Sequence, residues 1–228
     1  MEKRRIAYNG FMMAAGILAI GSIWGLLECV LGGIKLDIAG LPVSMGAVMA
    51  GLFGIGFMVL ARKLFDRTGV SLGVAIVAGV LRFFAPVGSC VLCAAIAMIV
   101  EGLIFELIIN RKIVLQSIRG VERDLRTLVF TGIIAGFIMF STGYMLTQVL
   151  TPLFTEGILI SLGDLWGILP LIFGRAFYAA FFGGMTLPAT VLVDRLHLDM
   201  NRLGRGVYYA TSVVISLFCW VMVLAVLF

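Results

Sequence analysis

The sequence predicts an all-α fold, a polytopic membrane bundle of six to seven transmembrane helices, and two observations predict it. Of the 228 residues, 62% are hydrophobic and only 13% are charged, whereas about 25% of the residues in a soluble domain are charged. Several apolar runs also reach the roughly 20 residues that a helix needs to cross a bilayer. We therefore expect residues 1–228 to form a single integral membrane domain in contact with lipid.

Seven apolar segments follow a short basic start that contains Lys3, Arg4 and Arg5. The first segment is long and is followed by further spans, so we expect a transmembrane helix and not a cleaved signal peptide. The third is short for a full span, and Pro86 ends it because proline lacks a backbone N–H and clashes with the preceding turn. The predicted helices cover residues 11–33, 42–64, 70–84, 88–110, 128–150, 165–193 and 207–228.

The fifth predicted helix carries a packing signal. Gly132 and Gly136 are four residues apart and form a small-xxx-small face, which lets a neighbouring helix approach closely. A long connection, residues 151–164, then leads to the sixth helix.

The basic residues predict the orientation, because lysine and arginine in short loops are retained on the cytoplasmic side. With a cytoplasmic N-terminus, all 17 basic residues except Lys35, Arg82 and Arg175 fall on that side or at its edge. Seven spans would then place the C-terminus outside. The formal charge of +5 thus reflects membrane topology, and we do not expect nucleic-acid binding.

The stretch from residue 79 to 110 places an arginine, a Cys-x-x-Cys pair and two glutamates in apolar sequence. Ionisable residues inside a membrane are costly and often mark functional sites. At 100° per residue, Glu106 lies about 140° around the helix from Glu101, where Arg111 and Lys112 are expected to neutralise it. One stripe of the same helix, at spacings of three, four and four residues, holds Cys90, Cys93, Ala97 and Glu101.

Other charges are predicted at a similar depth, in the outer half of the membrane. A buried arginine without a carboxylate is hard to tolerate, so we expect Arg175 to pair with Glu101 or Glu28. The alternative is that such a pair only holds helices together. If it forms a site, the site is a polar pocket open to the outside. Its candidate substrate-binding residues are Trp24, Glu28, Arg82, Cys90, Cys93, Glu101 and Arg175.

The Cys-x-x-Cys pair leaves several roles open. The pattern Pro-x-x-x-Cys-Val-Leu-Cys resembles membrane disulfide-forming, quinone-linked oxidoreductases, and an outer position suits that chemistry. Those enzymes have a second cysteine pair in an outer loop, whereas Cys29 and Cys219 lie in different helices. Cys90 and Cys93 are therefore candidates for redox catalysis, for ligation of a soft metal or corrinoid, or for plain packing, because free cysteine often behaves as a small hydrophobe.

Two features together resemble a known family, the substrate-binding S components of energy-coupling factor (ECF) vitamin transporters. One is the Ala-xxx-Ala patch Ala15-Gly16-Ile17-Leu18-Ala19. The other is AIVAGVLRFFAPVGSCVLCAAIAMIVEGLIFEL, residues 75–107, which is similar to the region of helices 3 and 4 in the subgroup associated with the thiamine precursor hydroxymethylpyrimidine. The likeness covers residues 15–107, and the seventh helix departs from the family's six-helix pattern.

The resemblance implies a subunit of an ABC importer in a prokaryotic cell membrane, which captures a vitamin-like molecule on the outer side. Ala15 and Ala19 would dock on a transmembrane coupling protein that acts with two cytosolic ATPases, and the connections 34–41 and 151–164 would act as lids. The chain has no G-x-x-x-x-G-K-[ST] loop, so energy would come from partners. No catalytic residue, cofactor or metal is expected. The alternatives are the thiol oxidoreductase and an accessory membrane subunit without a ligand. For Ala15 and Ala19 the alternative role is ordinary close packing inside the bundle.

Overall fold

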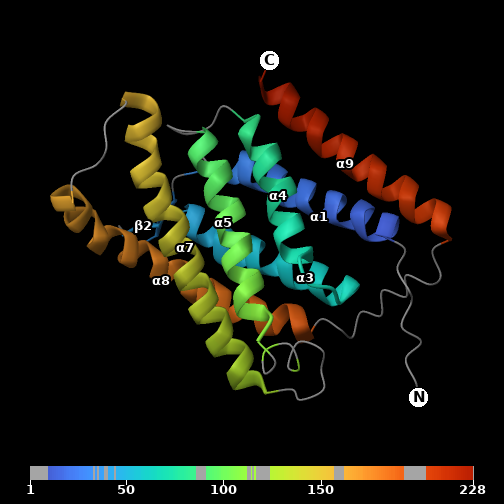
Figure 1. Cartoon of the computed structure of the whole chain (residues 1–228), viewed down its shortest axis with the longest axis horizontal. Helices are drawn as coiled ribbons and strands as arrows, with labels where there is room; N and C mark the ends of the chain where they lie inside the picture. Colours follow the sequence, from blue (N-terminus) through green and yellow to red (C-terminus); the bar gives the residue numbers. More distant parts are fainter. Residues whose placement is uncertain are drawn as a thin grey trace.

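The helical bundle that the sequence predicts is present in the structure, a computed structural model (Figure 1). It describes residues 10–32, 34, 36–38, 41–43, 45–85, 91–111, 114, 116, 124–156, 162–192 and 204–227. Within these ranges, six helices are long and apolar enough to cross a membrane.

The helices differ in length. A 14-residue helix, α4, is shorter than the others that cross the bundle, as its sequence predicts. The described elements are α1 (Gly10–Leu31), β1 (Leu36–Ile38), β2 (Leu41–Val43), α2 (Met45–Met49), η1 (Ala50–Gly54), α3 (Ile55–Phe65), α4 (Val70–Phe83), α5 (Val91–Ile109), α7 (Leu125–Glu156), α8 (Leu162–Leu192) and α9 (Arg205–Leu227).

Two boundaries differ from the sequence prediction. Residues assigned to the start of the second helix form β2, which pairs antiparallel with β1 in a small hairpin. The helix itself begins at Met45 and runs through a π-helical turn, η1, to Phe65. Most of the connection predicted at residues 151–164 is also helical, because α7 continues through Pro152 to Glu156 and α8 begins at Leu162. Proline is tolerated in membrane helices more readily than in soluble ones.

The predicted small-xxx-small face of α7 is confirmed. A Cβ atom added at Gly132 or Gly136 would overlap the backbone carbonyl oxygens of Gly183 and Ala179 in α8. The two longest helices therefore pack backbone to backbone, and Figure 1 shows α8 passing across α7.

An acidic cap marks the start of α7. The Asp124 carboxylate accepts hydrogen bonds from the hydroxyl of Thr127 and from the backbone N–H of Arg126. These contacts, the Thr127 hydroxyl first, hold the pKa of Asp124 below its ordinary value.

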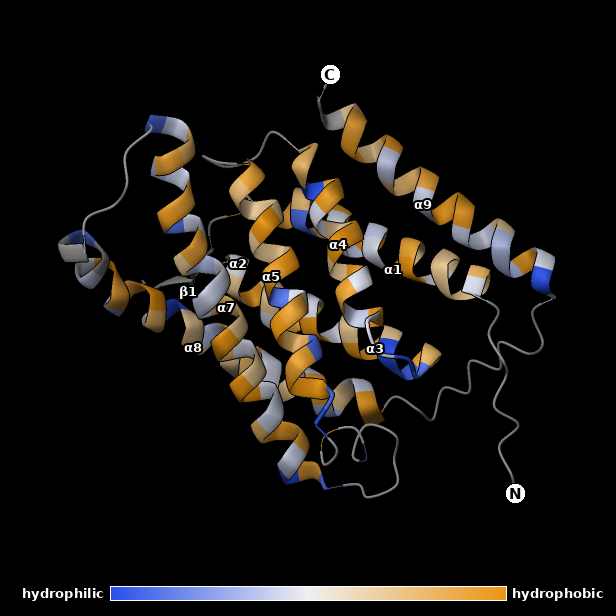
Figure 2. Cartoon of the chain, viewed as in Figure 1, coloured by the Kyte–Doolittle hydropathy of each residue, from blue (hydrophilic) through white to orange (hydrophobic). Residues whose placement is uncertain are grey.

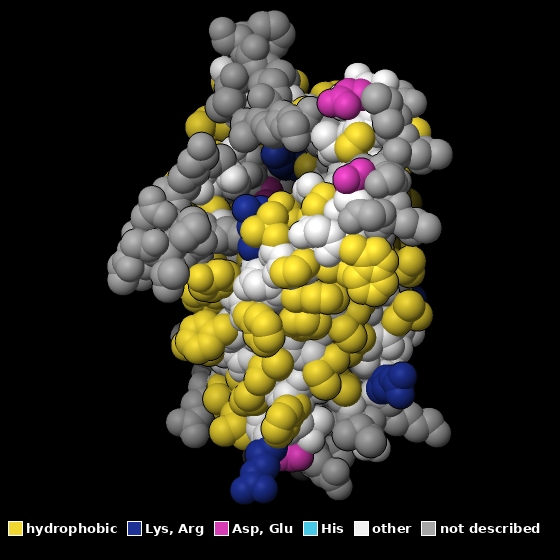
Figure 3. Space-filling view, turned by 90° about the vertical axis from the view of Figure 1, so that its left-hand side faces the viewer, with side chains coloured by type: hydrophobic (Ala, Val, Ile, Leu, Met, Phe, Trp, Pro, Cys, Tyr) yellow, Lys and Arg dark blue, Asp and Glu magenta, His cyan; other side chains and the backbone are white. Residues whose placement is uncertain are grey.

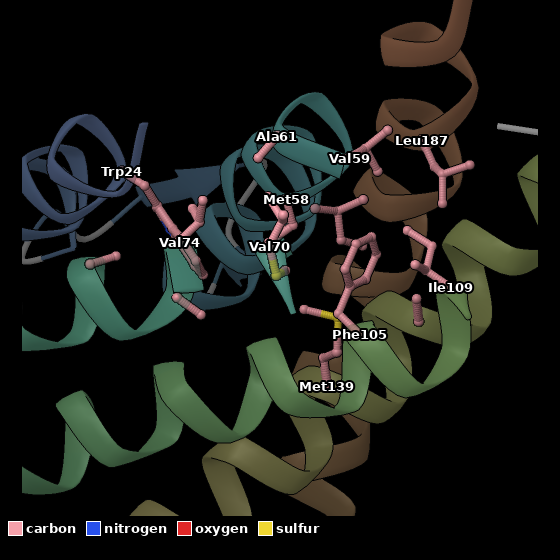
Figure 4. Close-up of a cluster of buried hydrophobic side chains, with 14 of the residues drawn as sticks. Trp24, Met58, Val59, Ala61, Val70, Val74, Phe105, Ile109, Met139 and Leu187 are labelled. Carbon is pink, nitrogen blue, oxygen red and sulfur yellow. The ribbon is translucent and has the colours of Figure 1, made fainter. Parts of the chain in front are cut away.

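The core is built from large apolar side chains of six helical elements. Trp24 in α1, Phe105 in α5 and Met58 in α3 are fully buried. Between lipid-exposed helices such packing stabilises by van der Waals contact and not by removal of surface from water. Figure 4 labels the side chains that meet here: Trp24, Met58, Val59, Ala61, Val70, Val74, Phe105, Ile109, Met139 and Leu187.

One buried polar cluster, which we call the clamp, joins α3, α4 and α5. It consists of Arg62, Glu106, Asn110, Gly69 and Ser71. The guanidinium of Arg62 lies 3.3 Å from Glu106 and donates a 2.8 Å hydrogen bond to Asn110. The Glu106 carboxylate also accepts the backbone N–H groups of Gly69 (2.8 Å) and Ser71 (3.2 Å) at the start of α4.

The clamp overturns the predicted role of Glu106. We expected a charge near a helix end, neutralised by Arg111 and Lys112, but the side chain is only 6% exposed and pairs with Arg62 of another helix. Lys112 lies outside the described residues. The prediction failed because spacing along one helix reveals only local partners, whereas a neighbouring helix supplies the buried cation.

The seventh helix, α9, lies at the edge of the bundle against α1 (Figure 1). The hydroxyl of Tyr208 donates to the carbonyl oxygen of Met12 (2.9 Å), and the indole N–H of Trp220 donates to the hydroxyl of Ser22 (3.2 Å). These bonds fix α9 along the length of α1.

The surface is that of a membrane protein. Along most helices in Figure 2 the hydrophobic residues predominate, and hydrophilic residues gather toward the ends. Figure 3 shows a broad hydrophobic band, with most of the charged side chains above and below it. Large side chains such as Phe130, Phe177 and Phe181 are more than 60% exposed, which suits contact with the lipid bilayer.

Candidate functional site

Trp24 and Glu28 lie one turn apart on the face of α1 that points into the bundle. The Trp24 indole N–H donates to the Glu28 carboxylate at 3.4 Å. The indole is fully buried and lies over Gly54 of η1, where an added Cβ would come within 3.0 Å of the ring. The absence of a side chain at Gly54 therefore makes room for the ring that orients Glu28.

Arg82 is at the end of α4, next to this part of α1. It is 8% exposed and donates a 3.2 Å hydrogen bond to the carbonyl oxygen of Ala85. Its positive charge also attracts Glu28. Glu28 thus has two compensating neighbours, the indole N–H and the guanidinium, as expected for opposite charges at similar depth.

Glu101 is in the middle of α5 and is 8% exposed. Its carboxylate lies against Gly143 of α7, where an added Cβ would be 2.7 Å from Oε1. Within the described part of the chain, no hydrogen-bond donor and no basic side chain pairs with it. The charged group that acts on it is Glu28, which has the same sign.

The predicted ion pair of Arg175 with Glu101 or Glu28 is wrong. Arg175 donates a hydrogen bond to the Tyr144 hydroxyl, and its guanidinium lies 5.2 Å from the centre of the Tyr144 ring. A phenol oxygen and an aromatic face can together satisfy a guanidinium inside a bundle. The prediction failed because it considered only carboxylates as partners for the arginine. The helix α7 thus carries both the partner of Arg175 and, at Gly143, a contact of Glu101.

Sequence reasoning missed the contribution of α7 to this region. Phe140 and Tyr144 stack with ring centres 5.5 Å apart and an interplanar angle of 8°, on either side of the turn that carries Gly143. The sequence signal that could have indicated this contribution is Gly143 followed by Tyr144 in an apolar helix. Figure 3 shows acidic and basic side chains set back from the surface near the upper end of the hydrophobic band.

The cysteines fall into two groups. Cys93 is 1% exposed and is disulfide-bonded, while its predicted stripe partner Cys90 lies outside the described residues. Cys29 and Cys219 are free thiols buried in one apolar cluster between α1 and α9. The described residues contain no group of three or more His, Cys, Asp or Glu that could hold a metal ion.

The helix α9 packs along the part of α1 that carries Ala15 and Ala19. Ala19 is only 7% exposed, and both alanines lie on the stripe between Met12 and Ser22, the two residues that bind α9. The surface that was predicted to dock on a coupling protein thus packs against the seventh helix, α9, in this structure.

Chemically, the arrangement offers two carboxylates and a guanidinium contributed by α1, α4 and α5. It brings Trp24, Glu28, Arg82 and Glu101 together, whereas Arg175 is engaged by Tyr144. Among the described residues, these charged groups suit the binding of a polar guest. No protein-family model, no curated protein and no solved structure matches the chain.

Proposed function

We propose that the protein is the membrane-embedded substrate-binding subunit of an ECF-type importer and that it captures a vitamin-like small molecule. One observation supports this most directly. Glu101 is buried in the middle of a membrane helix without a hydrogen-bond or ion-pair partner among the described residues. An ionisable group in that position is costly, and a guest that supplies the missing partner would offset the cost.

The neighbours of Glu101 support the same proposal. Glu28 is oriented by Trp24 and lies near Arg82, so a guest would meet a second carboxylate at a defined angle. The strand β1 lies within the connection 34–41 that is proposed as a lid, and β2, its partner in the hairpin, begins at the last residue of that connection. In this proposal the lid closes over the guest on the outer side of a prokaryotic cell membrane.

Energy for release would come from partners, because the chain has no phosphate-binding loop of the Walker type. The proposal assigns this role to a coupling protein and two cytosolic ATPases. Since α9 packs along the part of α1 that carries Ala15 and Ala19, docking at that face requires α9 to move aside.

Copurification tests the proposal. Tagged protein at its native level should bring down a membrane coupling protein and two ATPases. Recovery of the protein without an ATPase, under conditions that preserve membrane complexes, would contradict the importer.

The second candidate function is a thiol–disulfide oxidoreductase, and one observation favours it: Cys93 is disulfide-bonded. The burial of Cys29 and Cys219 in an apolar cluster argues against it, because thiol–disulfide exchange requires an accessible thiolate. Replacing both Cys90 and Cys93 with serine separates the candidates. An importer should keep most of its uptake, whereas a redox enzyme would lose its activity.

A further inference from the structure

The charge balance around Glu101 bears on what the site binds, and this inference rests on the proposed function. Glu28 has the Trp24 indole and Arg82 as compensating neighbours. Arg175, which the sequence predicted as a partner of these acids, is engaged by Tyr144 instead. Glu101 has neither, and the charge that acts on it comes from Glu28. The site therefore contains one acid, Glu101, whose charge no described basic side chain or hydrogen-bond donor compensates.

The Glu101 carboxylate remains reachable. Three polar atoms of the described side chains are closed off from solvent and make no hydrogen bond: Arg62 Nε, Ser141 Oγ and Thr186 Oγ1. The oxygens of Glu101 are not among them although they have no partner, so they keep accessible surface. The carboxylate packs against Gly143, which leaves room for it by having no side chain. A guest would meet Glu101 on the part of its surface that Gly143 does not cover.

A carboxylate held in a bundle without a partner is strongly disfavoured, so it carries either a proton or a bound cation. A metal ion fits poorly, because two carboxylates are fewer ligands than Ca²⁺ or Zn²⁺ requires and the described residues hold no larger cluster. A cationic nitrogen group fits better, because it supplies both charge and hydrogen-bond donors.

We propose that the site binds a small organic cation, an amidinium or protonated amine, with Glu101 as its counter-ion. In the empty site Glu101 holds a proton, which leaves for the solvent when the cation binds. Glu28 keeps its indole hydrogen bond and adds a second, weaker attraction. The proposal distinguishes the two acids: Glu101 selects the charge of the guest and Glu28 contributes less.

Matched fragments test the charge preference. Benzamidine is a planar cation and benzamide is its neutral isostere, and both can be titrated calorimetrically into the full-length protein in lipid nanodiscs. We expect the wild type to bind benzamidine at least about tenfold tighter than benzamide, which corresponds to about 1.4 kcal/mol. Glu101→Gln should remove this preference, because an amide keeps the shape and loses the charge, whereas Glu28→Gln should retain part of it.

Proton release provides the second readout. Titrations in buffers with different ionisation enthalpies should show that benzamidine releases up to one proton from the wild type and none from Glu101→Gln. Equal affinity of the two fragments, no binding of benzamidine, or an unchanged preference in Glu101→Gln would each overturn the proposal. Copurification of the ATPases does not depend on the charge of the guest, so it can succeed while the cation proposal fails, and the reverse.

Discussion

The contact between Glu101 and Gly143 decides where a guest can bind. The carboxylate occupies the space that any other residue at position 143 would fill with a side chain. Binding in the bundle therefore depends on the absence of a Cβ atom at Gly143 as well as on the carboxylate of Glu101.

Substituting this glycine tests that dependence. We expect Gly143→Ala to displace the Glu101 carboxylate and to lower guest affinity by about tenfold, the effect of about 1.4 kcal/mol. Gly167→Ala is the matched control, because an added Cβ there meets nothing within 4 Å. Titration of both variants with the same probe checks the prediction, and equal affinities for the two would refute it.

The sequence predicted the acids better than their partners. Trp24, Glu28, Arg82 and Glu101 could be placed near one another from depth and helical face alone, because both follow from 100° and 1.5 Å per residue. The partner of Arg175 could not, since it depends on how α7 and α8 rotate against each other. That rotation is set by close backbone contacts such as Gly136 with Ala179.

At the scale of elements, the clamp holds three helices at one end of the bundle. Arg62 comes from α3, Glu106 from α5, and the bonded N–H groups from the first residues at the start of α4. Such a buried pair is costly to break from one side, because the remaining charge stays without a partner.

Removing one member of the clamp should therefore destabilise the fold. We expect Glu106→Gln to lower the free energy of unfolding by about 3 to 5 kcal/mol, measured by thermal or denaturant unfolding in detergent. Glu156→Gln, a change at an exposed helix end, serves as the control. If Glu106→Gln unfolds like the wild type, the clamp does not hold these helices.

The helix α9 defines a second interface, with small residues on both sides. On α9, Ser212 and Ser216 are buried four residues apart, facing the α1 stripe that contains Ala15 and Ala19. Small residues allow two membrane helices to approach closely.

A large side chain on this stripe should disturb the interface. We expect Ala19→Trp to lower stability by about 1 to 3 kcal/mol through overpacking. Leu18→Trp should be tolerated, because Leu18 is 40% exposed. Thermal unfolding of the two variants compares them, and equal losses would show that α9 does not pack over Ala19.

At the scale of the whole molecule, composition was enough to predict the fold class, because 62% hydrophobic residues leave few alternatives to a membrane bundle. The helix ends were harder to predict. Residues 42 and 43 were predicted to begin a helix but belong to β2, since the hairpin depends on a partner strand earlier in the chain. The packing along Ala15 and Ala19 likewise depends on a helix almost 200 residues away.

The basic residues also predict a cytoplasmic N-terminus and, with seven crossings, an external C-terminus. A C-terminal alkaline phosphatase fusion should be active and a C-terminal green fluorescent protein fusion dark, because only the former matures outside. The opposite pattern would mean that the chain crosses the membrane an even number of times.

The central claim is that an unpaired acid inside the bundle, Glu101, binds a small molecule. Mass spectrometry of compounds that copurify with the wild type, Glu101→Ala and Glu156→Ala tests it most directly. We expect one organic compound to accompany the wild type and the Glu156→Ala control and to be depleted at least about tenfold in Glu101→Ala, since losing a buried partner costs more than the 1.4 kcal/mol that a tenfold change requires. The same compounds in all three samples, or none in any, would contradict the claim.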